Sequence, residues 1–278
     1  MIMRYLVPIV FFIVGLLRFS GWGECEDGVR VNSTASVCVS SSGGSWVVTN
    51  NSPKDVFVPN ATQVEFDAFY DKAASLGITV TSMTFTHVAG SVAPVTKTIS
   101  YGTVNTDLGG TGTKCWITQN LGAARQATSV NDATEASAGW YWQFNKKQGY
   151  KHDGTTRTPN TAWITSISES SNWLVANDPC TLLLRSGWRI PTYTEWYNAD
   201  SGWSIGANAF ASILKLHQAG YVAYSPAGAL LESGSGGLYY SSTQYSSTWG
   251  WYLIFWDDYS GMGHQSKAIG QTLRCLKD

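Results

Sequence analysis

The chain has 278 residues, a formal net charge of −1 and a charged fraction of only 13 %, about half of the quarter that is usual for globular proteins. No cluster of Lys and Arg appears in it, which excludes the basic surface that nucleic-acid binding requires. The length allows one large domain or two ordinary domains of roughly 100–200 residues each. With so few charges, the surface must consist largely of Trp, Tyr, Ser, Thr, Asn and Gly, as in many extracellular binding proteins.

The N-terminal residues have the pattern of an export signal. Arg4 precedes an apolar run over residues 5–17, which is shorter than the roughly 20 residues that span a bilayer but suits the core of a signal peptide. We therefore expect residues 1–24 to be a signal peptide or, alternatively, a membrane anchor, and the protein to lie at the cell surface or outside the cell. Cys25 suggests a lipid anchor, although Glu24 directly before it departs from the lipidation motif.

Five cysteines in an exported chain predict disulfides with one thiol left over. The sequence contains no CxxC pair and no Cys/His cluster, so neither a zinc site nor another cofactor is expected. The cysteines are Cys25, Cys38, Cys115, Cys180 and Cys275.

Residues 25–98 are predicted to form a small N-terminal module, β-rich or α+β. Short strands are indicated over 27–58, and apolar residues at helical spacing indicate an amphipathic helix over 60–76. The segment 78–88 alternates as a strand does. This module carries no catalytic signature.

The composition changes near Thr96, and eleven of the 13 Trp residues follow it. Thr192 and Glu195 have the spacing of a capping box, in which each side chain bonds the other's backbone amide at the start of a helix. The other predicted elements are strands within 114–122 and 140–146, a helical turn over 131–138, a short helix ending at 177–179, a helix over 207–216 and a hairpin over 219–234.

The segment 236–275 has the pattern around which we expect the rest to be organised. Its residues 251–256 alternate as a strand with two different faces, and a turn rich in Asp, Ser and Gly follows. Because Leu253 and Phe255 are purely apolar, we predict one face inward and the other outward. The inward residues are Trp251, Leu253 and Phe255, and the outward ones are Tyr252, Ile254 and Trp256.

Five segments resemble, in order, the bacterial Fibrobacter succinogenes major paralogous domain family over roughly residues 99–278. They are KCWITQNLG, GWYWQFN, DPCTLLLRSGWRIPTYTEWYNA, GLYYSST and the terminal LRCLKD. The resemblance implies an α+β domain of the C-type-lectin-like fold, which also serves formylglycine-generating enzymes and the variable proteins of diversity-generating retroelements. Residues 1–98 are outside it.

In those variable proteins, the segment between a YxSST-like motif and a closing RC contacts the ligand. Applied to this chain, the resemblance implies that residues 245–271 form the ligand-binding segment. The implied ligand is a protein or glycan on another cell or surface. Adenine mutagenesis of a retroelement does not account for Trp249, Trp256 and Gln265. The residues that fit the adenine-mutagenesis set are Tyr245, Ser246, Tyr252, Ile254, Asp257, Asp258, Tyr259, His264 and Ile269. The implied binding residues are Tyr245, Trp249, Tyr252, Ile254, Trp256, Asp257, Asp258, Tyr259 and His264.

The same fold implies a bridge between Cys180 and Cys275, with Cys115 competing for either partner. The sequence allows three functions: a surface binding module, which it favours, a structural adhesin or pilus-tip subunit, and an oxidative enzyme of the formylglycine-generating type. No GxSxG context surrounds a serine, and the cysteines lack the spacing of the enzymes' reactive pair, so no enzyme activity is expected. His217 is predicted to be a buried or capping histidine, and the pair Asp257 and Asp258 to be a solvated turn.

Overall fold

The computed structural model describes residues 28–31, 80–108, 110, 112–185 and 187–278. The expectations for the leader 1–24, for strands over 32–58 and for a helix over 60–76 lie outside the described residues. The chain divides into two compact units, Met1–Thr84 and Phe85–Asp278. The smaller unit contains β1 (Gly28–Val31) and the first part of β2 (Val80–His87), which pair antiparallel with Gly28 opposite Thr84.

The strand predicted over 78–88 is thus confirmed as β2, but its end belongs to the larger unit. Residues 85–98, which we expected in the N-terminal module, lie in that unit as well. The physical reason is burial: Phe85 and His87 are each 3 % exposed. The His87 ring lies 5.6 Å from the ring of Trp140, and its Nε2 is 3.0 Å from the hydroxyl of Tyr101.

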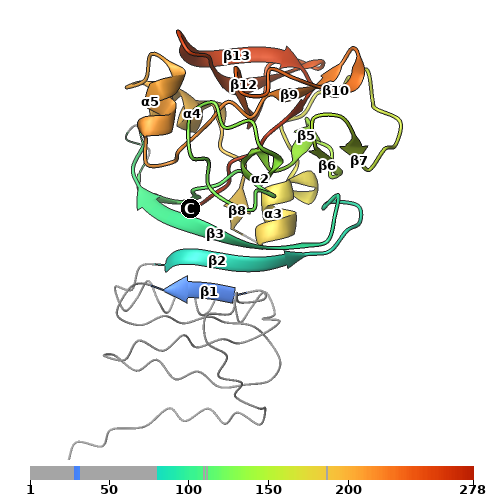
Figure 1. The fold of residues 1–278 in the computed structure, drawn as a ribbon. Coiled ribbons are helices and arrows are strands. Elements are labelled where there is room, and N and C mark those ends of the chain that lie inside the picture. The colour runs from blue at the N-terminus through green and yellow to red at the C-terminus, as the bar shows by residue number, and fades with distance from the viewer. Residues whose placement is uncertain (1–27, 32–79, 109, 111, 186) are drawn as a thin grey trace, which may run out of the picture. The chain divides into compact units, whose positions relative to one another are not determined.

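The larger unit is built mainly of short antiparallel strands, so its class is a strand-rich α+β fold (Figure 1). Four strands lie side by side in the order β3-β4-β15-β8. Their bounds are β3 (Lys97–Thr106), β4 (Lys114–Ile117), β15 (Leu276–Lys277) and β8 (Trp188–Arg189). The last strand of the chain therefore lies between two strands from much earlier in the sequence.

A second sheet has the order β10-β9-β14-β5-β6-β7, and a third has the order β11-β12-β13. The predicted hairpin over 219–234 is confirmed as β9 and β10, and the predicted strand within 140–146 as β5. The bounds in the second sheet are β10 (Ala227–Leu231), β9 (Tyr221–Tyr224), β14 (Gly270–Gln271), β5 (Tyr141–Gln143), β6 (Gly149–His152) and β7 (Arg157–Thr158); those in the third are β11 (Gly237–Gln244), β12 (Trp249–Phe255) and β13 (Ser260–Ser266).

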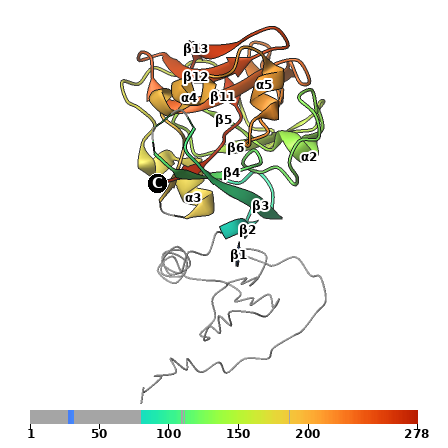
Figure 2. The ribbon, with the colours of Figure 1, turned by 90° about the vertical axis from the view of Figure 1, so that its left-hand side faces the viewer.

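The helices of the larger unit are short, and the predicted capping box is confirmed. Thr192 Oγ1 accepts a hydrogen bond from the Glu195 amide at 3.3 Å, and Glu195 Oε2 accepts one from the Thr192 amide at 2.8 Å. This box starts α4, which packs on β12 and β13 (Figure 2). The helical elements are α2 (Glu135–Ala138), η1 (Val175–Asn177), α3 (Pro179–Leu184), α4 (Tyr193–Asp200) and α5 (Gly206–Ala211).

The helix predicted over 207–216 ends early, at Ala211. Ser212 is extended, and Lys215 has a φ of 53° in the left-handed region, so the chain turns away after one and a half turns. The turn carries Leu214 and Leu216 into the main core, where both are fully buried. Burial of these two side chains therefore overrides the helical spacing that the sequence shows.

The main core lies between α4, α5 and the inner face of the β11-β12-β13 sheet. It also includes residues from β4 and β15, which are neighbours in another sheet. Its buried members are Trp116, Trp196, Ala199, Ala209, Leu214, Leu216, Tyr239, Leu253, Phe255 and Leu276.

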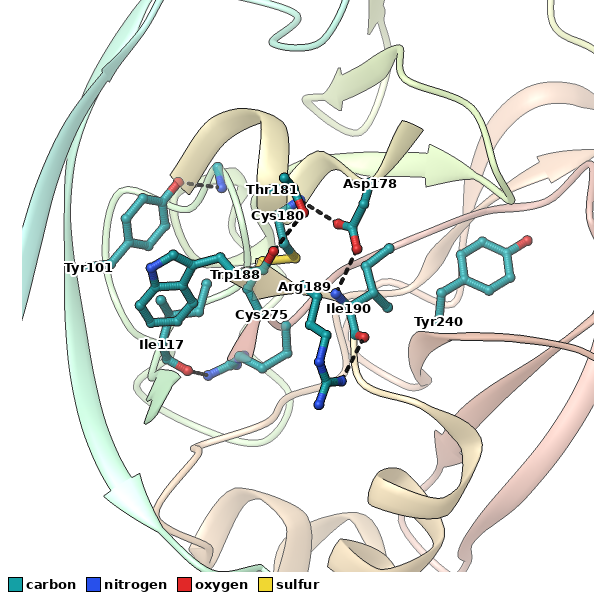
Figure 3. Close-up of a disulfide and its surroundings, with 12 residues drawn as sticks. Tyr101, Ile117, Asp178, Cys180, Thr181, Trp188, Arg189, Ile190, Tyr240 and Cys275 are labelled. Carbon is teal, nitrogen blue, oxygen red and sulfur yellow. Dashed lines mark hydrogen bonds between the residues drawn. A yellow bond between two sulfur atoms is a disulfide. The ribbon is translucent and has the colours of Figure 1, made fainter. Parts of the chain in front are cut away.

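The disulfide between Cys180 and Cys275 is present, with Cα atoms 5.6 Å apart (Figure 3). It joins the first turn of α3 to the residue before β15. The side chain of Asp178 caps α3 by accepting a hydrogen bond from the amide of Cys180 at 2.8 Å. Its second carboxylate oxygen accepts one from the amide of Ile190, beyond the helix, at 3.0 Å. Cys115, the competing candidate, is buried and takes no part in this bridge.

We expect the double substitution of Cys180 and Cys275 by Ala to lower the free energy of unfolding by roughly 2–5 kcal/mol, because the bridge closes a long loop in the unfolded chain. Urea denaturation of the full chain measures this loss. Cys115→Ala is the matched control and should cost about 1 kcal/mol, as an ordinary buried substitution does. An unchanged urea midpoint after reduction of the wild type would contradict the expectation.

Burial makes the stability of the larger unit depend on pH through two histidines. Desolvation lowers the pKa of His87 and that of His217 from 6.5 to about 3. The unfolded chain therefore binds more protons than the folded chain below pH 6.5, and stability is lost as the pH falls from there. Asp178 opposes this trend, because burial raises its pKa to about 6 and favours the folded state in acid.

His217 allows this dependence to be tested, because neither ring nitrogen has a hydrogen-bond partner among the described residues. We expect the wild type to lose about 2 kcal/mol more stability than His217→Leu when the pH falls from 7 to 5. Urea denaturation at both pH values gives the two differences. Equal losses in the two proteins would show that His217 does not titrate in this way.

Candidate functional site

The structure places the nine predicted binding residues in three groups along β12 and its two turns. Tyr245, Trp249 and His264 lie where β12 begins, Tyr252 and Ile254 lie within the strand, and 256–259 form the turn to β13. At about 3.3 Å per residue, the two ends of β12 are roughly 20 Å apart. The predicted residues therefore do not form one continuous face.

The predicted outward orientation of Tyr252 and Ile254 is wrong, because each is only 6 % exposed. They do lie opposite Leu253 and Phe255, which are fully buried, but the second face of the sheet is covered too. Tyr240, the cross-strand partner of Tyr252, is fully buried on that face. Both faces of this strand are thus largely inside the protein, and alternation of residue type cannot distinguish two buried faces.

Trp251 departs from the prediction in the opposite sense. The alternation predicts it inward with Leu253 and Phe255, but it is only half-buried and does not belong to the main core. Its ring centroid is 4.6 Å from that of Tyr193 on α4 and 5.0 Å from that of Tyr245. The inner face of the sheet therefore continues past the core as an accessible group of rings.

We call this group the aromatic surface. Its members come from the first turns of α4, from the β11–β12 turn and from the middle of β12 and β13. Tyr197 is 56 % exposed, Tyr245 51 % and Trp249 43 %, while the others are half-buried between them. The aromatic surface consists of Tyr193, Tyr197, Tyr245, Trp249, Trp251 and His264.

His264 lies at the centre of the aromatic surface. Its ring is stacked on that of Tyr245, with centroids 3.9 Å apart and planes inclined by 7°. The ring of Trp249 is 5.0 Å away and that of Trp251 is 5.2 Å away. Such offset and edge-to-face contacts hold aromatic rings in place. The exposed rings are therefore positioned before any ligand arrives.

Tyr193, Tyr197 and Trp251 were not predicted as site residues. Tyr193 and Tyr197 stand four residues apart, so the turn of α4 puts them on one side, and their rings stack with centroids 5.8 Å apart. This spacing was a signal that the sequence contained. Their position beside β12 depends on how α4 packs, which no local pattern indicates.

The β11–β12 turn is fixed from behind by the irregular segment 168–173. The amide of Glu169 donates to the carbonyl of Ser247 at 2.8 Å, and the amide of Trp173 donates to that of Ser242 at 2.8 Å. The Gln244 amide donates to Asn172 Oδ1 at 3.0 Å. Main-chain bonds thus join this segment to the turn that carries Tyr245 and Trp249.

Lys267 joins the same two segments through its side chain. Its Nζ donates to the carbonyl of Glu169 at 2.6 Å and to Gln244 Oε1 at 3.1 Å, and lies 4.8 Å from the centre of the Phe144 ring. The residue is completely buried, and burial lowers the pKa of its ammonium. Its own amide donates to Thr248 in the turn. Lys267 therefore fixes the support of the aromatic surface.

The residues at the other end of β12 form a second exposed group. Trp256 is 37 % exposed and Tyr259 is 44 % exposed, with ring centroids 5.9 Å apart. The Trp256 indole donates to Glu232 Oε2 at 3.2 Å, and Asp257 Oδ1 accepts from the Gln218 side chain at 2.8 Å. Asp257 and Asp258 are exposed in the turn, as predicted.

Within the described residues, no three His, Cys, Asp or Glu side chains are grouped so as to hold a metal ion. His217 is confirmed as a buried histidine, at 1 % exposure. The aromatic surface itself offers flat apolar area with phenol, indole and imidazole groups at its edges. Its chemistry is that of noncovalent recognition.

No protein-family model, no curated protein and no solved structure matches this chain. Among the described residues, no helix has the length and apolar character needed to cross a membrane.

We expect Lys267→Met to loosen the β11–β12 turn, because Met keeps the apolar volume but leaves the Glu169 carbonyl and Gln244 Oε1 without their donor. The cost should be about 1–3 kcal/mol. Hydrogen exchange of the full chain should become faster in 244–249 and 168–173. Lys147→Met, at an exposed lysine, is the control and should leave exchange unchanged. Equal exchange in both variants would show that the Lys267 ammonium does not fix the turn.

Proposed function

We propose that this chain is an exported ligand-binding protein whose larger unit presents the aromatic surface on a C-type-lectin-like scaffold. The proposed ligand is a protein or glycan on another cell or surface. The observation that carries the proposal is the gathering of six rings at one end of the β11-β12-β13 sheet, with three of them substantially exposed. The five sequence segments that resemble the paralogous domain family support the scaffold.

The physical properties of the aromatic surface suit recognition. Tyr and Trp bury much area while losing little side-chain freedom, and both are enriched in the centres of protein interfaces. Exposed rings of this kind would be unfavourable in water unless something covered them. The contacts of His264 with three neighbouring rings reduce the ordering that binding would require.

The rigid support behind the rings favours the same function. Main-chain hydrogen bonds fix the β11–β12 turn to segment 168–173, and Lys267 adds two further bonds. A surface whose backbone is already ordered loses less conformational entropy on binding. The proposed site is therefore preorganised.

Retroelement diversification, which the resemblance suggests, would act unevenly on this structure. Tyr252, Ile254 and Ile269 fit the adenine-mutagenesis set but are buried at 6 %, 6 % and 4 % exposure. Changes there would alter packing rather than ligand choice. Tyr245 and His264 fit the set and lie in the aromatic surface, so changes at these two positions would alter what it binds.

The proposal is tested by applying the fluorescently labelled full chain to an array of immobilised glycans and to intact cells. We expect Tyr245→Ala with Trp249→Ala to weaken binding at least thirtyfold, since loss of an interface hot spot costs about 2 kcal/mol or more. The melting temperature should change little, because both side chains are about half exposed.

Tyr224→Ala is the matched control, since this tyrosine is 44 % exposed on β9 and lies outside the aromatic surface. It should bind as the wild type does. Undiminished binding by the double variant, or equal loss with Tyr224→Ala, would reject the aromatic surface as the binding site.

A further inference from the structure

A surface cavity of about 400 Å³ lies in the larger unit between α2, the β5–β6 region and β10. Its lining draws on residues more than ninety positions apart in the sequence. None of them was predicted as a site residue, and none belongs to the aromatic surface. The lining residues are Ala133, Glu135, Ala138, Tyr141, His152, Asp153, Gly154, Leu230, Leu231, Glu232 and Ser233.

The charged groups of the cavity are unbalanced. Three carboxylates line it, and among the described residues only that of Glu135 is in a salt bridge, with Lys151 at 3.0 Å. Glu232 is exposed, and its Oε2 accepts a hydrogen bond from the indole of Trp256. Asp153 Oδ1 accepts from the amides of Thr155 at 2.9 Å and Thr156 at 2.7 Å. Neutral donors thus orient two carboxylates whose charge is not paired.

His152, the one lining residue that could supply a positive charge, is buried. Its Nδ1 accepts a hydrogen bond from the Gly154 amide at 3.0 Å, and burial lowers its pKa, so the ring is neutral at pH 7. The amides that bond Asp153 lower the pKa of its carboxyl, which is therefore ionised. The cavity is consequently negative at neutral pH.

Apart from Ser233 and Gly154, the rest of the lining consists of Ala, Leu and Tyr side chains. Ala138 is 3 % exposed, Tyr141 is fully buried with its hydroxyl donated to the Ala219 carbonyl at 2.7 Å, and Leu230 packs against the same cluster of buried residues. The accessible apolar part of the lining is therefore supplied by Leu230 and Leu231, which are half-buried. Aliphatic side chains beside carboxylates suit an alkyl chain that ends in a positive charge.

We propose that this cavity binds an alkylammonium group, with its charge held by Glu232 and Asp153 and its chain against Leu230 and Leu231. The site is separate from the aromatic surface, and it adjoins the second exposed group through the hydrogen bond between Glu232 and Trp256. A free polyamine and a lysine side chain of a partner protein both carry this group.

The test is isothermal titration calorimetry of the full chain at low salt with two probes. 1,4-Diaminobutane represents a free polyamine, and Nα-acetyl-lysine amide represents a lysine side chain. 1,4-Butanediol is the neutral counterpart of the diamine. We expect binding in the millimolar range or tighter for at least one charged probe, and none for the diol. Glu232→Gln and Asp153→Asn should each weaken it at least tenfold.

Asp258→Asn is the control, because its carboxylate is exposed in the β12–β13 turn and does not line the cavity. It should leave the affinity unchanged. Tighter binding of the diamine would identify a free polyamine as the source, and tighter binding of the lysine derivative a partner's side chain. Equal binding of the diol, unchanged affinity in both cavity variants, or no binding of either charged probe would overturn the proposal. If Glu232→Gln does not fold, Asp153→Asn gives the same answer.

Discussion

The fold of the larger unit depends on how its last residues, 273–278, are bonded to the rest of it. Cys275 is bonded to Cys180, and the guanidinium of Arg274, 1 % exposed, donates to the carbonyl of Leu214 at 2.6 Å and to Asn120 Oδ1 at 2.8 Å. A buried cation without a carboxylate is costly unless such acceptors surround it. Burial lowers the pKa of Arg274 to about 10, which still leaves it charged at neutral pH. The correct fold is therefore the arrangement that brings these acceptors together.

These C-terminal residues are linked to the aromatic surface through α4. Arg189 on β8, the neighbour of β15, forms a salt bridge with Glu195 at 2.7 Å, and Glu195 also completes the capping box of α4. At the next residue, the indole of Trp196 donates to the carbonyl of Tyr240 on β11 at 3.1 Å. The helix is thus fixed at its start and along its buried side, and Tyr193 and Tyr197 are carried to Trp251. The aromatic surface is a consequence of this packing.

Much of the local structure could be predicted because its causes are local. The capping box, the hairpin of β9 and β10 and the strand β12 each follow from residues close together in the sequence. The disulfide was predicted only through a family resemblance, since five cysteines permit several pairings. Its position in the structure agrees with that expectation, whereas the family itself and the lectin-like fold stay proposals.

The candidate site was harder to predict because its causes are not local. Alternation assigns Tyr252 to the surface, but that face is buried as well, and Phe144 and Trp173 pack there on Tyr240. This burial depends on how distant segments pack and not on the strand's own residues. Tyr193 and Tyr197 were missed because their role depends on the docking of α4 beside β12. The cavity beneath β10 was missed for the same reason, since no short stretch contains both Glu232 and Asp153.

The turn between β11 and β12 is bonded to the rest of the unit mostly through its main chain. The carbonyls of Ser247 and Thr248 accept from Glu169 and Lys267, and the amides of Tyr245 and Ser246 both donate to the carbonyl of Trp249. These bonds exist whatever side chains the turn carries. Residues 245 and 249 can therefore be exchanged without removing these bonds. A protein built in this way can acquire new binding specificities by mutation with little loss of stability. The turn is therefore also a suitable position for laboratory libraries of variants.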